Sequence, residues 1–344
     1  MIRKMQQITR DNANIIKNLI STKERIVITS HHNPDGDAIG SMLGLYHILT
    51  SMGYDSSMVI PNDIPDFLSW LPDSSKIIRH SKNKQAAADA ICNADLIFSL
   101  DYNSPSRLEA VKENFDQSKA VKILIDHHPY PEEAFTWILS ETKASSTAEL
   151  VYEFALILNA EMHIGHNAAM CIFTGIMTDT GSFSYACSNP RTFEIAAKLI
   201  AKGVKVEDIQ QQVYNNFSES RMRLLGYSLE SKMKVFPEYR SAYISLTYEE
   251  LKRYKYQIGD TEGLVNYPLS IKNIIFSALF IENKNFVKVS LRSVGAFPAN
   301  KVCEEHFNGG GHINAAGGKS FATMQETEAK FVEILKQYQK ELNQ

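Results

Sequence analysis

Short apolar runs alternate with helical patterns through the first half of the chain. The runs at 24–30, 54–60, 94–101 and 119–128 have the length and composition of buried strands. A helical pattern or a loop separates each run from the next, and parallel strands need long crossover connections of this kind. The alternation therefore predicts a doubly wound, mostly parallel α/β sheet.

The chain has 344 residues, more than one compact core usually holds, so we expect two domains. We assign residues 1–189 to the first α/β domain and 237–344 to a smaller second one. Between them, 190–236 has the pattern of a helical connector. In the second domain we expect strands at 240–247, 274–283 and 286–293, and a closing amphipathic helix over 323–344.

Composition narrows the classes of protein. A formal net charge of −3 argues against a long basic track for duplex DNA. Four scattered cysteines without a C-x-x-C pair argue against a disulfide framework and a thiolate zinc site. No apolar run is long enough to span a membrane, and the amphipathic helix expected over 1–20 lacks the features of a signal peptide. We expect a cytoplasmic protein with this helix packed on its own chain; a homodimer is left open.

A first polar motif, HHNPDGD at 31–37, directly follows the first strand. Ligand sites of open α/β sheets lie at the carboxyl ends of the strands. Asp35 and Asp37 would repel each other there, and a divalent cation with carboxylate and imidazole ligands, including His31, would relieve the repulsion. The same letters also suit an Asx-turn with a helix cap, so this motif alone leaves both interpretations open.

More acidic and imidazole residues follow the later strands. Asp101 ends the third run, and Asp126, His127 and His128 end the fourth. Adjacent side chains of an extended chain point to opposite sides, so one histidine can bind a metal while its neighbour turns to a phosphate oxygen. The aspartate beside them can orient an imidazole. Asp179 lies at the end of an expected helix.

Successive strands that all end in Asp or His converge on one edge of a parallel sheet, which favours metal binding over unrelated caps. The predicted ligands are His31, Asp35, Asp37, Asp101, His127 and Asp179. This set suits two octahedral-type ions that share a bridging carboxylate. Such pairs clamp the attacking and leaving oxygens of an in-line phosphoryl displacement.

The second domain carries a glycine-rich stretch, FNGGGHINAAGG, at 307–318. Gly309, Gly310 and Gly311, placed before an expected helix start, would let backbone N–H groups approach an anion closely. His312 can add a donor, and Arg292 could pair with a phosphate in a fork. The alternative is a flexible loop with a core histidine, although the small residues that follow favour close helix packing.

Together these motifs resemble the DHH phosphoesterase superfamily, and specifically the subfamily with a C-terminal DHHA1 domain. DHH at 126–128 matches the family signature, HHNPDGD the first motif, Asp101 the second and GIMTDTGSF, which contains Asp179, the fourth. GGGHINAAGG is similar to the DHHA1 nucleotide-binding motif. Size and arrangement resemble the nano-RNase and pAp phosphatase group.

The resemblance implies a role for each motif. One manganese ion would be held by His31, Asp35 and Asp101, and a second by Asp37, Asp101, His127 and Asp179. His128 would contact the scissile phosphate and help to protonate the leaving oxygen, while Asp126 orients the histidine pair. Substrate contacts would come from Arg292, Gly309, Gly310, Gly311, His312 and Asn314. By ligand type alone, iron, cobalt or magnesium would also be accepted.

The implied substrates are short RNA or DNA oligonucleotides, linear or cyclic dinucleotides, and 3′-phosphoadenosine 5′-phosphate (pAp), with no membrane partner. An inorganic pyrophosphatase or exopolyphosphatase is an alternative because it uses a similar metal site, but it would favour more clustered Lys and Arg than the GGGH stretch offers. A non-catalytic nucleotide-binding protein is an alternative of another class. Such a protein would have no need of a bridged metal pair.

Overall fold

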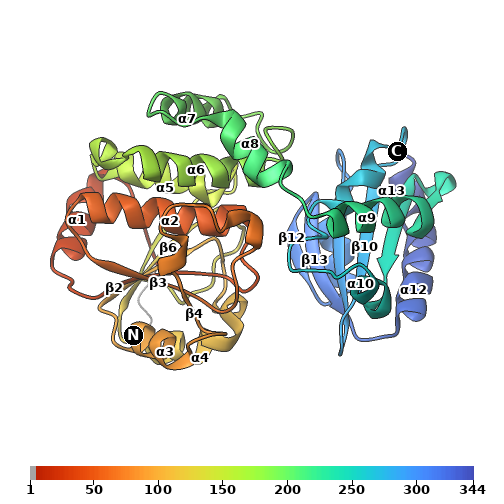
Figure 1. Ribbon diagram of the computed structural model, residues 1–344, viewed down its shortest axis with the longest axis horizontal. Coiled ribbons are helices and arrows are strands. Elements are labelled where there is room, and N and C mark those ends of the chain that lie inside the picture. Colours follow the sequence, from red (N-terminus) through yellow and green to blue (C-terminus); the bar gives the residue numbers. More distant parts are fainter. Residues whose placement is uncertain (1–4) are drawn as a thin grey trace. The chain divides into compact units, whose positions relative to one another are not determined.

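In the computed structural model, which describes residues 5–344, the chain folds into two compact α/β units (Figure 1). The first unit extends to Asn216, and the second runs from Phe217 to Gln344. Each unit has one sheet with helices on both faces. The predicted doubly wound domain and the second α/β domain are therefore confirmed. Within residues 5–344, no helix is long and apolar enough to cross a membrane.

The first sheet is parallel throughout its described residues, in the order β1-β7-β6-β5-β2-β3-β4. Its strands are Gln6–Gln7 (β1), Ile26–Ser30 (β2), Ser56–Ile60 (β3), Ile78–Arg79 (β4), Leu96–Leu100 (β5), Val121–Asp126 (β6) and Trp137–Ser140 (β7). The chain runs outward from β2 to β4 and then returns to β5 on the other side of β2. This reversal makes the carboxyl ends of β2 and β5 a topological switch point, where open α/β sheets bind ligands.

Helices cover both faces of this sheet, α1, α2, α5 and α6 on one face and α3 and α4 on the other (Figure 1). Their bounds are Ala13–Ser21 (α1), Gly36–Ser51 (α2), Lys84–Cys92 (α3), Lys112–Gln117 (α4), Thr147–Ile157 (α5) and His166–Asp179 (α6). Outside this layer, Pro190–Ile200 (α7) packs against α5 and α6, and Val206–Tyr214 (α8) follows. The order of strands and helices follows the predicted alternation.

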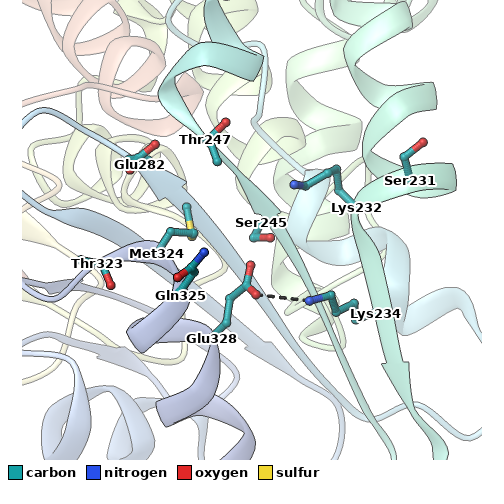
Figure 2. A pocket seen from close by; sticks show the side chains of 10 residues that line it. All are labelled: Ser231, Lys232, Lys234, Ser245, Thr247, Glu282, Thr323, Met324, Gln325 and Glu328. Atoms are coloured by element: carbon teal, nitrogen blue, oxygen red, sulfur yellow. Dashed lines mark hydrogen bonds and ion pairs between the residues drawn. The ribbon is translucent and has the colours of Figure 1, made fainter.

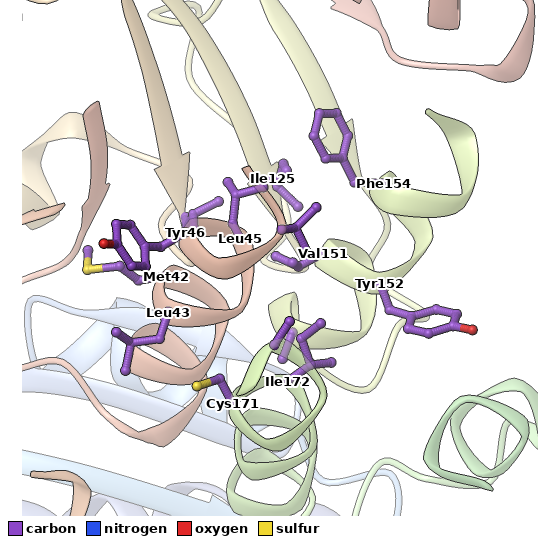
Figure 3. Close-up of a cluster of buried hydrophobic side chains, with 14 of the residues drawn as sticks. Met42, Leu43, Leu45, Tyr46, Ile125, Val151, Tyr152, Phe154, Cys171 and Ile172 are labelled. Atoms are coloured by element: carbon purple, nitrogen blue, oxygen red, sulfur yellow. The ribbon is translucent and has the colours of Figure 1, made fainter. Parts of the chain in front are cut away.

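The core of the first unit lies between the sheet and helices α2, α5 and α6 (Figure 3). Helix α2 is apolar around its whole circumference, as expected of a helix buried on all sides. Its glycines permit a close approach to α6. A Cβ on Gly40 would lie 2.6 Å from the carbonyl oxygen of Cys171 and 2.8 Å from the amide nitrogen of Gly175. At the start of α2, a Cβ on Gly36 would meet Thr178 near the end of α6, so the two helices run antiparallel.

The N-terminal segment differs from its prediction. The expected helix over 1–20 begins only at Ala13. A 3-10 turn, Arg10–Asn12, precedes it, and the backbone amide of Thr9 donates to Oδ1 of Asn12. Before it, β1 pairs in parallel with β7 at the sheet edge. Residues 1–4, which also belong to the predicted helix, lie outside the described residues. Ile16 and Ile20 are buried as predicted, whereas Ile15 is exposed.

The second sheet is mixed, in the order β12-β13-β11-β10-β9-β8. Its strands are Met233–Phe236 (β8), Ser241–Leu246 (β9), Phe276–Glu282 (β10), Val287–Ser293 (β11), Gly310–His312 (β12) and Ala315–Ser320 (β13). Its helices are Glu219–Tyr227 (α9), Tyr248–Arg253 (α10), Ala299–His306 (α11), Met324–Gln337 (α12) and Gln339–Leu342 (α13). One apolar cluster joins the sheet to α11, α12 and α13, and another joins its other face to α9 and α10.

The segment 190–236, predicted as a connector, is divided between the units. Helices α7 and α8 belong to the first unit, whereas α9 belongs to the second. The last residues of the segment form β8, which pairs with β9 at the edge of the second sheet. The strand is short and has no buried residue, so it gives little sequence signal.

The glycine-rich stretch forms a β-hairpin of β12 and β13, so the expected helix start after the glycines is wrong. The small residues serve strand packing. A Cβ on Gly309 would lie 2.0 Å from the carbonyl oxygen of Gly317, and one on Gly318 would lie 2.4 Å from that of Phe307. The hairpin thus passes close to the end of α11, and glycine is required by space.

We expect Gly40→Ala to destabilise the protein by roughly 1–3 kcal/mol, because the added methyl group forces the backbones of α2 and α6 apart. Gly226→Ala is the matched control, since this glycine of α9 has nothing within 4 Å of a built Cβ. Replacement of this glycine by the better helix former alanine should leave the stability unchanged or raise it by about 0.5–1 kcal/mol. Urea denaturation measures both, and equal effects of the two variants would contradict the close α2–α6 approach.

Candidate metal centre

The predicted polar residues of the first unit gather at the carboxyl edge of its sheet. They are His31, Asp35 and Asp37 after β2, Asp101 after β5, Asp126, His127 and His128 at the end of β6, and Asp179 at the end of α6. The positions of β2 and β5 place these groups at the topological switch point. Segments far apart in the sequence thus supply one compact cluster.

Three groups of residues form the cluster in the described part of the first unit, and the ligand atoms of each group lie within 4.8 Å of one another. The groups are His31 with Asp35 and Asp101, Asp37 with His127 and Asp179, and Asp101 with Asp126 and His128. Asp101 lies in the middle. Its Oδ2 is 3.4 Å from Nε2 of His31, and its Oδ1 is 3.7 Å from Nε2 of His127 and from Nδ1 of His128. A central carboxylate of this kind could be shared by two ions.

The backbone at two of these positions is specialised. Asp35 is the N-cap of α2, and its Oδ1 accepts hydrogen bonds from the amides of Asp37 and Ala38. The predicted helix cap is therefore confirmed for Asp35, and metal binding through its second carboxylate oxygen stays a prediction. Asp101 has a φ of +65°, which is rare for residues other than glycine, and its amide donates to the carbonyl of Ile125. Such strain is typical of functional sites.

Hydrogen bonds to the backbone orient two of the imidazoles. Nδ1 of His31 lies 2.9 Å from the carbonyl oxygen of His32, and Nδ1 of His127 lies 3.4 Å from that of Ala144. A carbonyl can only accept, so each Nδ1 carries a proton, and each Nε2 is the atom that could offer a lone pair to a metal ion. This is the usual arrangement of metal-binding histidines.

Burial sets the protonation of the carboxylates. It raises the pKa of Asp37 well above its ordinary value, and the charges of Asp101 and Asp179 add to this rise. Burial would also raise the pKa of Asp101, but hydrogen bonding to His31 and the neighbouring imidazoles hold it below its ordinary value. Surrounding protein raises the pKa of Asp179 to about 6, although its side chain is 31% exposed and so reachable from solvent.

His128 has different surroundings from His127. Its Nδ1 lies 2.7 Å from Oδ1 of Asp126, a carboxylate without solvent exposure. Burial lowers the pKa of His128, but the hydrogen bond and the charge of Asp126 outweigh it and raise this pKa to about 9. His128 is therefore protonated at neutral pH and can donate a proton from Nε2.

The donor set fits divalent ions. Imidazole nitrogens and carboxylate oxygens suit ions such as Mn²⁺, Fe²⁺, Co²⁺ and, with fewer imidazoles, Mg²⁺. Oδ2 of Asp126 is buried and has no hydrogen-bond partner among the described residues, so it is an unsatisfied acceptor at the edge of the cluster. Four aspartates around one point would otherwise repel each other strongly.

Arg292 and His312, predicted to bind substrate, lie in one row of the second sheet. Arg292 on β11 pairs with Ala315 on β13, and Ala315 pairs in turn with His312 on β12. Two strand spacings separate them, about 10 Å. Asn314, also predicted to bind substrate, donates its side-chain amide to Ser293 Oγ and to the carbonyl of Gly295. Its amide group closes the turn after β11.

The second unit also contains a cavity of about 440 Å³ (Figure 2). Its charged lining residues are Lys232, Lys234, Glu282 and Glu328. Lys234 lies 3.2 Å from Glu328, and Lys232 lies 2.8 Å from Glu250. The predicted substrate residues do not line this cavity. Its lysines are paired with carboxylates, so it has no excess positive charge for a phosphate.

Sequence reasoning missed Thr147. It is not among the predicted site residues, yet its amide donates to Oδ2 of Asp37 and its hydroxyl to Oδ1 of Asp101. The signal available was the run Ser145-Ser146-Thr147, hydroxyl residues opening a helix directly after a strand of the same sheet. Their position at the carboxyl edge was not used.

Fold and centre define a class of protein, a two-domain α/β protein with a histidine–aspartate centre suited to divalent ions at its sheet edge. The chain belongs to the DHH family: residues 25–176 match the DHH family N-terminal domain, and residues 244–341 match the DHHA1 domain. The resemblance predicted from the motifs is confirmed.

Similar proteins extend over most of the chain. It is 30% identical over 293 residues to the bifunctional oligoribonuclease and PAP phosphatase NrnA of Thermus thermophilus, which covers 85% of this chain and 83% of the relative. It is 27% identical to a probable NrnA of Streptococcus mutans, over 92% and 95% of the two chains. A crystal structure of an exopolyphosphatase-related protein from Bacteroides fragilis has 43% identity and a TM-score of 0.92, over 98% of this chain and 99% of that one.

We expect divalent-ion affinity to fall as the pH is lowered from 8 to 5.5, because protons compete for Asp179, whose pKa is about 6, and for Asp37. Binding near pH 6 should release protons, which calorimetry in buffers of different ionisation enthalpy measures. An affinity that does not change over this range would contradict the assignment of these carboxylates.

The raised pKa values also determine how the stability of the metal-free protein changes with pH. Asp179 and His128 both have raised pKa values, so the folded state holds their protons more tightly than the unfolded state. Their contribution to stability is lost as the pH rises, through about 6 for Asp179 and through about 9 for His128. Bound metal should reduce the contribution of Asp179 to this pH dependence of stability.

Proposed function

We propose that this protein is a metal-dependent phosphoesterase that hydrolyses short oligonucleotides and pAp. The observation that carries the proposal is the convergence of five aspartates and three histidines at the switch point of the first sheet. Membership of the DHH family, with NrnA proteins of this activity among the relatives, supports the same reaction class.

Two divalent ions, with manganese as the proposed native metal, would be held by the residues predicted from the sequence. His31 and Asp35 would serve one ion, Asp37, His127 and Asp179 the other, and Asp101 both. When bound, such ions activate water and neutralise charge on the phosphoryl oxygens. The residues that the first sheet brings together have the nitrogen and oxygen donors that this requires.

His128 and Asp126 would act on the leaving group. The Asp126 carboxylate accepts from Nδ1 of His128, keeps the imidazole protonated and fixes its orientation. Nε2 is then the donor for a phosphoryl oxygen or for the departing oxygen. Proton donation of this kind contributes typically 10²–10⁴-fold to a rate.

The second unit would hold the nucleotide part of the substrate. Arg292 can pair with a phosphate through two parallel hydrogen bonds, and His312 in the same row can add a further contact. The backbone of Gly309, Gly310 and Gly311 remains a proposed contact, now as the edge strand of a hairpin. Asn314 is proposed to act indirectly, by fixing the turn that follows Arg292.

Hydrolysis of polyphosphate is the second candidate function. It is favoured by the close similarity to the Bacteroides fragilis protein, which is described as exopolyphosphatase-related. Against it, the two lysines of the second unit's cavity are already paired with carboxylates. A chain of phosphates would require several unpaired cations.

A comparison of substrates tests the proposal directly. With manganese, we expect hydrolysis of pAp and a ribodinucleotide, slower hydrolysis of a ribopentamer, and little release from pyrophosphate or polyphosphate. Arg292→Ala should raise the KM for the dinucleotide roughly tenfold or more by loss of a charge-assisted contact. The exposed Arg223→Ala, which removes a surface pair with Glu219, should leave it unchanged.

Two results would contradict this part of the proposal. Preferred hydrolysis of polyphosphate would establish the second candidate function. An unchanged KM and kcat for the dinucleotide in Arg292→Ala would remove this residue from the substrate site.

Asp101→Ala should abolish activity and metal binding together, leaving below about 1% of wild-type turnover, because a shared ligand serves both ions. Asp95→Ala is the matched control, since Asp95 precedes the same strand at its other end and only pairs with the exposed Arg25. Elemental analysis and phosphate release give the two readouts. A folded Asp101→Ala protein that keeps its metal and its activity would contradict the assignment.

A further inference from the structure

The segment Ala144–Ala148, which we call the α5 entry segment, contacts three different members of the metal centre. The carbonyl oxygen of Ala144 faces Nδ1 of His127. The amides and the hydroxyl further along reach Asp37 and Asp101. The predicted ligand set does not include any residue of this segment.

Asp37 is held by this segment through both of its oxygens. Oδ2 accepts from the amide of Thr147 at 2.7 Å, and Oδ1 accepts from the amide of Ala148 at 2.8 Å. Ser41 adds a longer hydrogen bond to Oδ1 at 3.3 Å. The carboxylate thus sits at the N-terminus of α5, where the helix dipole also favours negative charge.

Asp101 is held by a side chain. The hydroxyl of Thr147 donates to its Oδ1 at 3.0 Å, in a site where Thr147 is fully buried and Asp101 is 2% exposed. That hydrogen bond fixes the rotation of the carboxylate plane and leaves Oδ2 beside His31. One residue therefore orients two carboxylates that belong to different parts of the cluster.

A buried carboxylate outside the cluster locks the segment in place. Oε2 of Glu149 accepts from the hydroxyl of Ser145 at 2.6 Å and from the hydroxyl of Thr192, on α7, at 2.7 Å. The amide of Glu149 donates to the N-cap oxygen of Ser146. Glu149 is 3% exposed and has no role in the metal centre itself, so its contacts serve to hold the start of α5.

We propose that Thr147 is a positioning residue of the metal centre, which orients Asp101 through its hydroxyl, and that the Glu149–Thr192 hydrogen bond keeps it in place. The proposal rests on the proposed metal-dependent function. Loss of an outer hydrogen bond to a metal-binding group typically costs about 10–100-fold in affinity or activity. The backbone contacts to Asp37 survive any substitution of the side chain, so the effect is specific to Asp101.

The test compares four variants of the full-length protein. Thr147→Val keeps the β-branched shape and removes the hydroxyl, and Thr147→Ser restores it. Thr192→Val removes the hydrogen bond from Thr192 to Glu149. Thr174→Val is the matched control, because this buried threonine of α6 donates only to the carbonyl of Met170 in its own helix.

Calorimetry measures the affinity for Mn²⁺, and electron paramagnetic resonance records the spectrum of the bound ions. The kcat and KM for a ribodinucleotide are measured as well. We expect Thr147→Val to lose about 10-fold or more in Mn²⁺ affinity and to alter the spectrum, with Thr147→Ser close to wild type and Thr192→Val between them. Thr174→Val should match wild type. If Thr147→Val does not fold, Thr147→Ala takes its place.

Wild-type affinity and spectrum in a folded Thr147→Val or Thr147→Ala protein would overturn the inference alone. The same follows if Thr147→Ser is as impaired as Thr147→Val, because then shape and not the hydroxyl matters. A wild-type protein that binds no Mn²⁺ and hydrolyses no phosphoester would overturn the proposed function, and this inference with it.

Discussion

Repulsion among clustered aspartates is the constraint on which the first unit depends. Asp35, Asp37, Asp101 and Asp179 come from three elements, and two of them, Asp37 and Asp101, are buried. Helix N-termini offset part of the cost, since α2 begins at one of these residues and α5 presents its amides to another. The remainder calls for cations, and this requirement links the folding of the sheet edge to the chemistry that the family performs.

Much of the first unit could be predicted because each local signal has a single physical meaning. Buried parallel strands are continuous apolar runs, and polar residues that directly follow them must lie at the carboxyl edge. The residues that follow β2, β5 and β6 were found for this reason. Thr147 was not found, because a threonine at a helix start has an ordinary explanation, and only the packing of α5 beside Asp37 and Asp101 reveals its second use.

The second unit was harder to predict. Glycine permits a strand, a turn or the approach of a ligand with equal ease, so the stretch at 307–318 fits a loop before a helix as well as the observed hairpin. The conformation of this stretch depends on the close approach of Gly309 and Gly318 to Cys303 and of Gly318 to Phe307. The hydrophobic pattern of the sequence does not indicate these contacts. Likewise, the side-chain amide of Asn314 is suited to a ligand contact, but in the structure it closes a turn by donating to the carbonyl of Gly295. The sequence does not show that Gly295 lies beside it.

The antiparallel contact of α2 with α6 has a consequence for ion choice. The first helix begins beside Asp37 and the second ends in Asp179, while Gly36, Gly40 and Gly44 allow the two axes to approach over about two turns. The distance between the two helix axes and the distance between the carboxylates of Asp37 and Asp179 therefore change together. Substitutions that widen the helix pair, even several turns from the cluster, would shift the preferred ionic radius. With Asp37 and Asp179 as the proposed ligands, discrimination between large and small cations would depend on helix packing as much as on ligand identity.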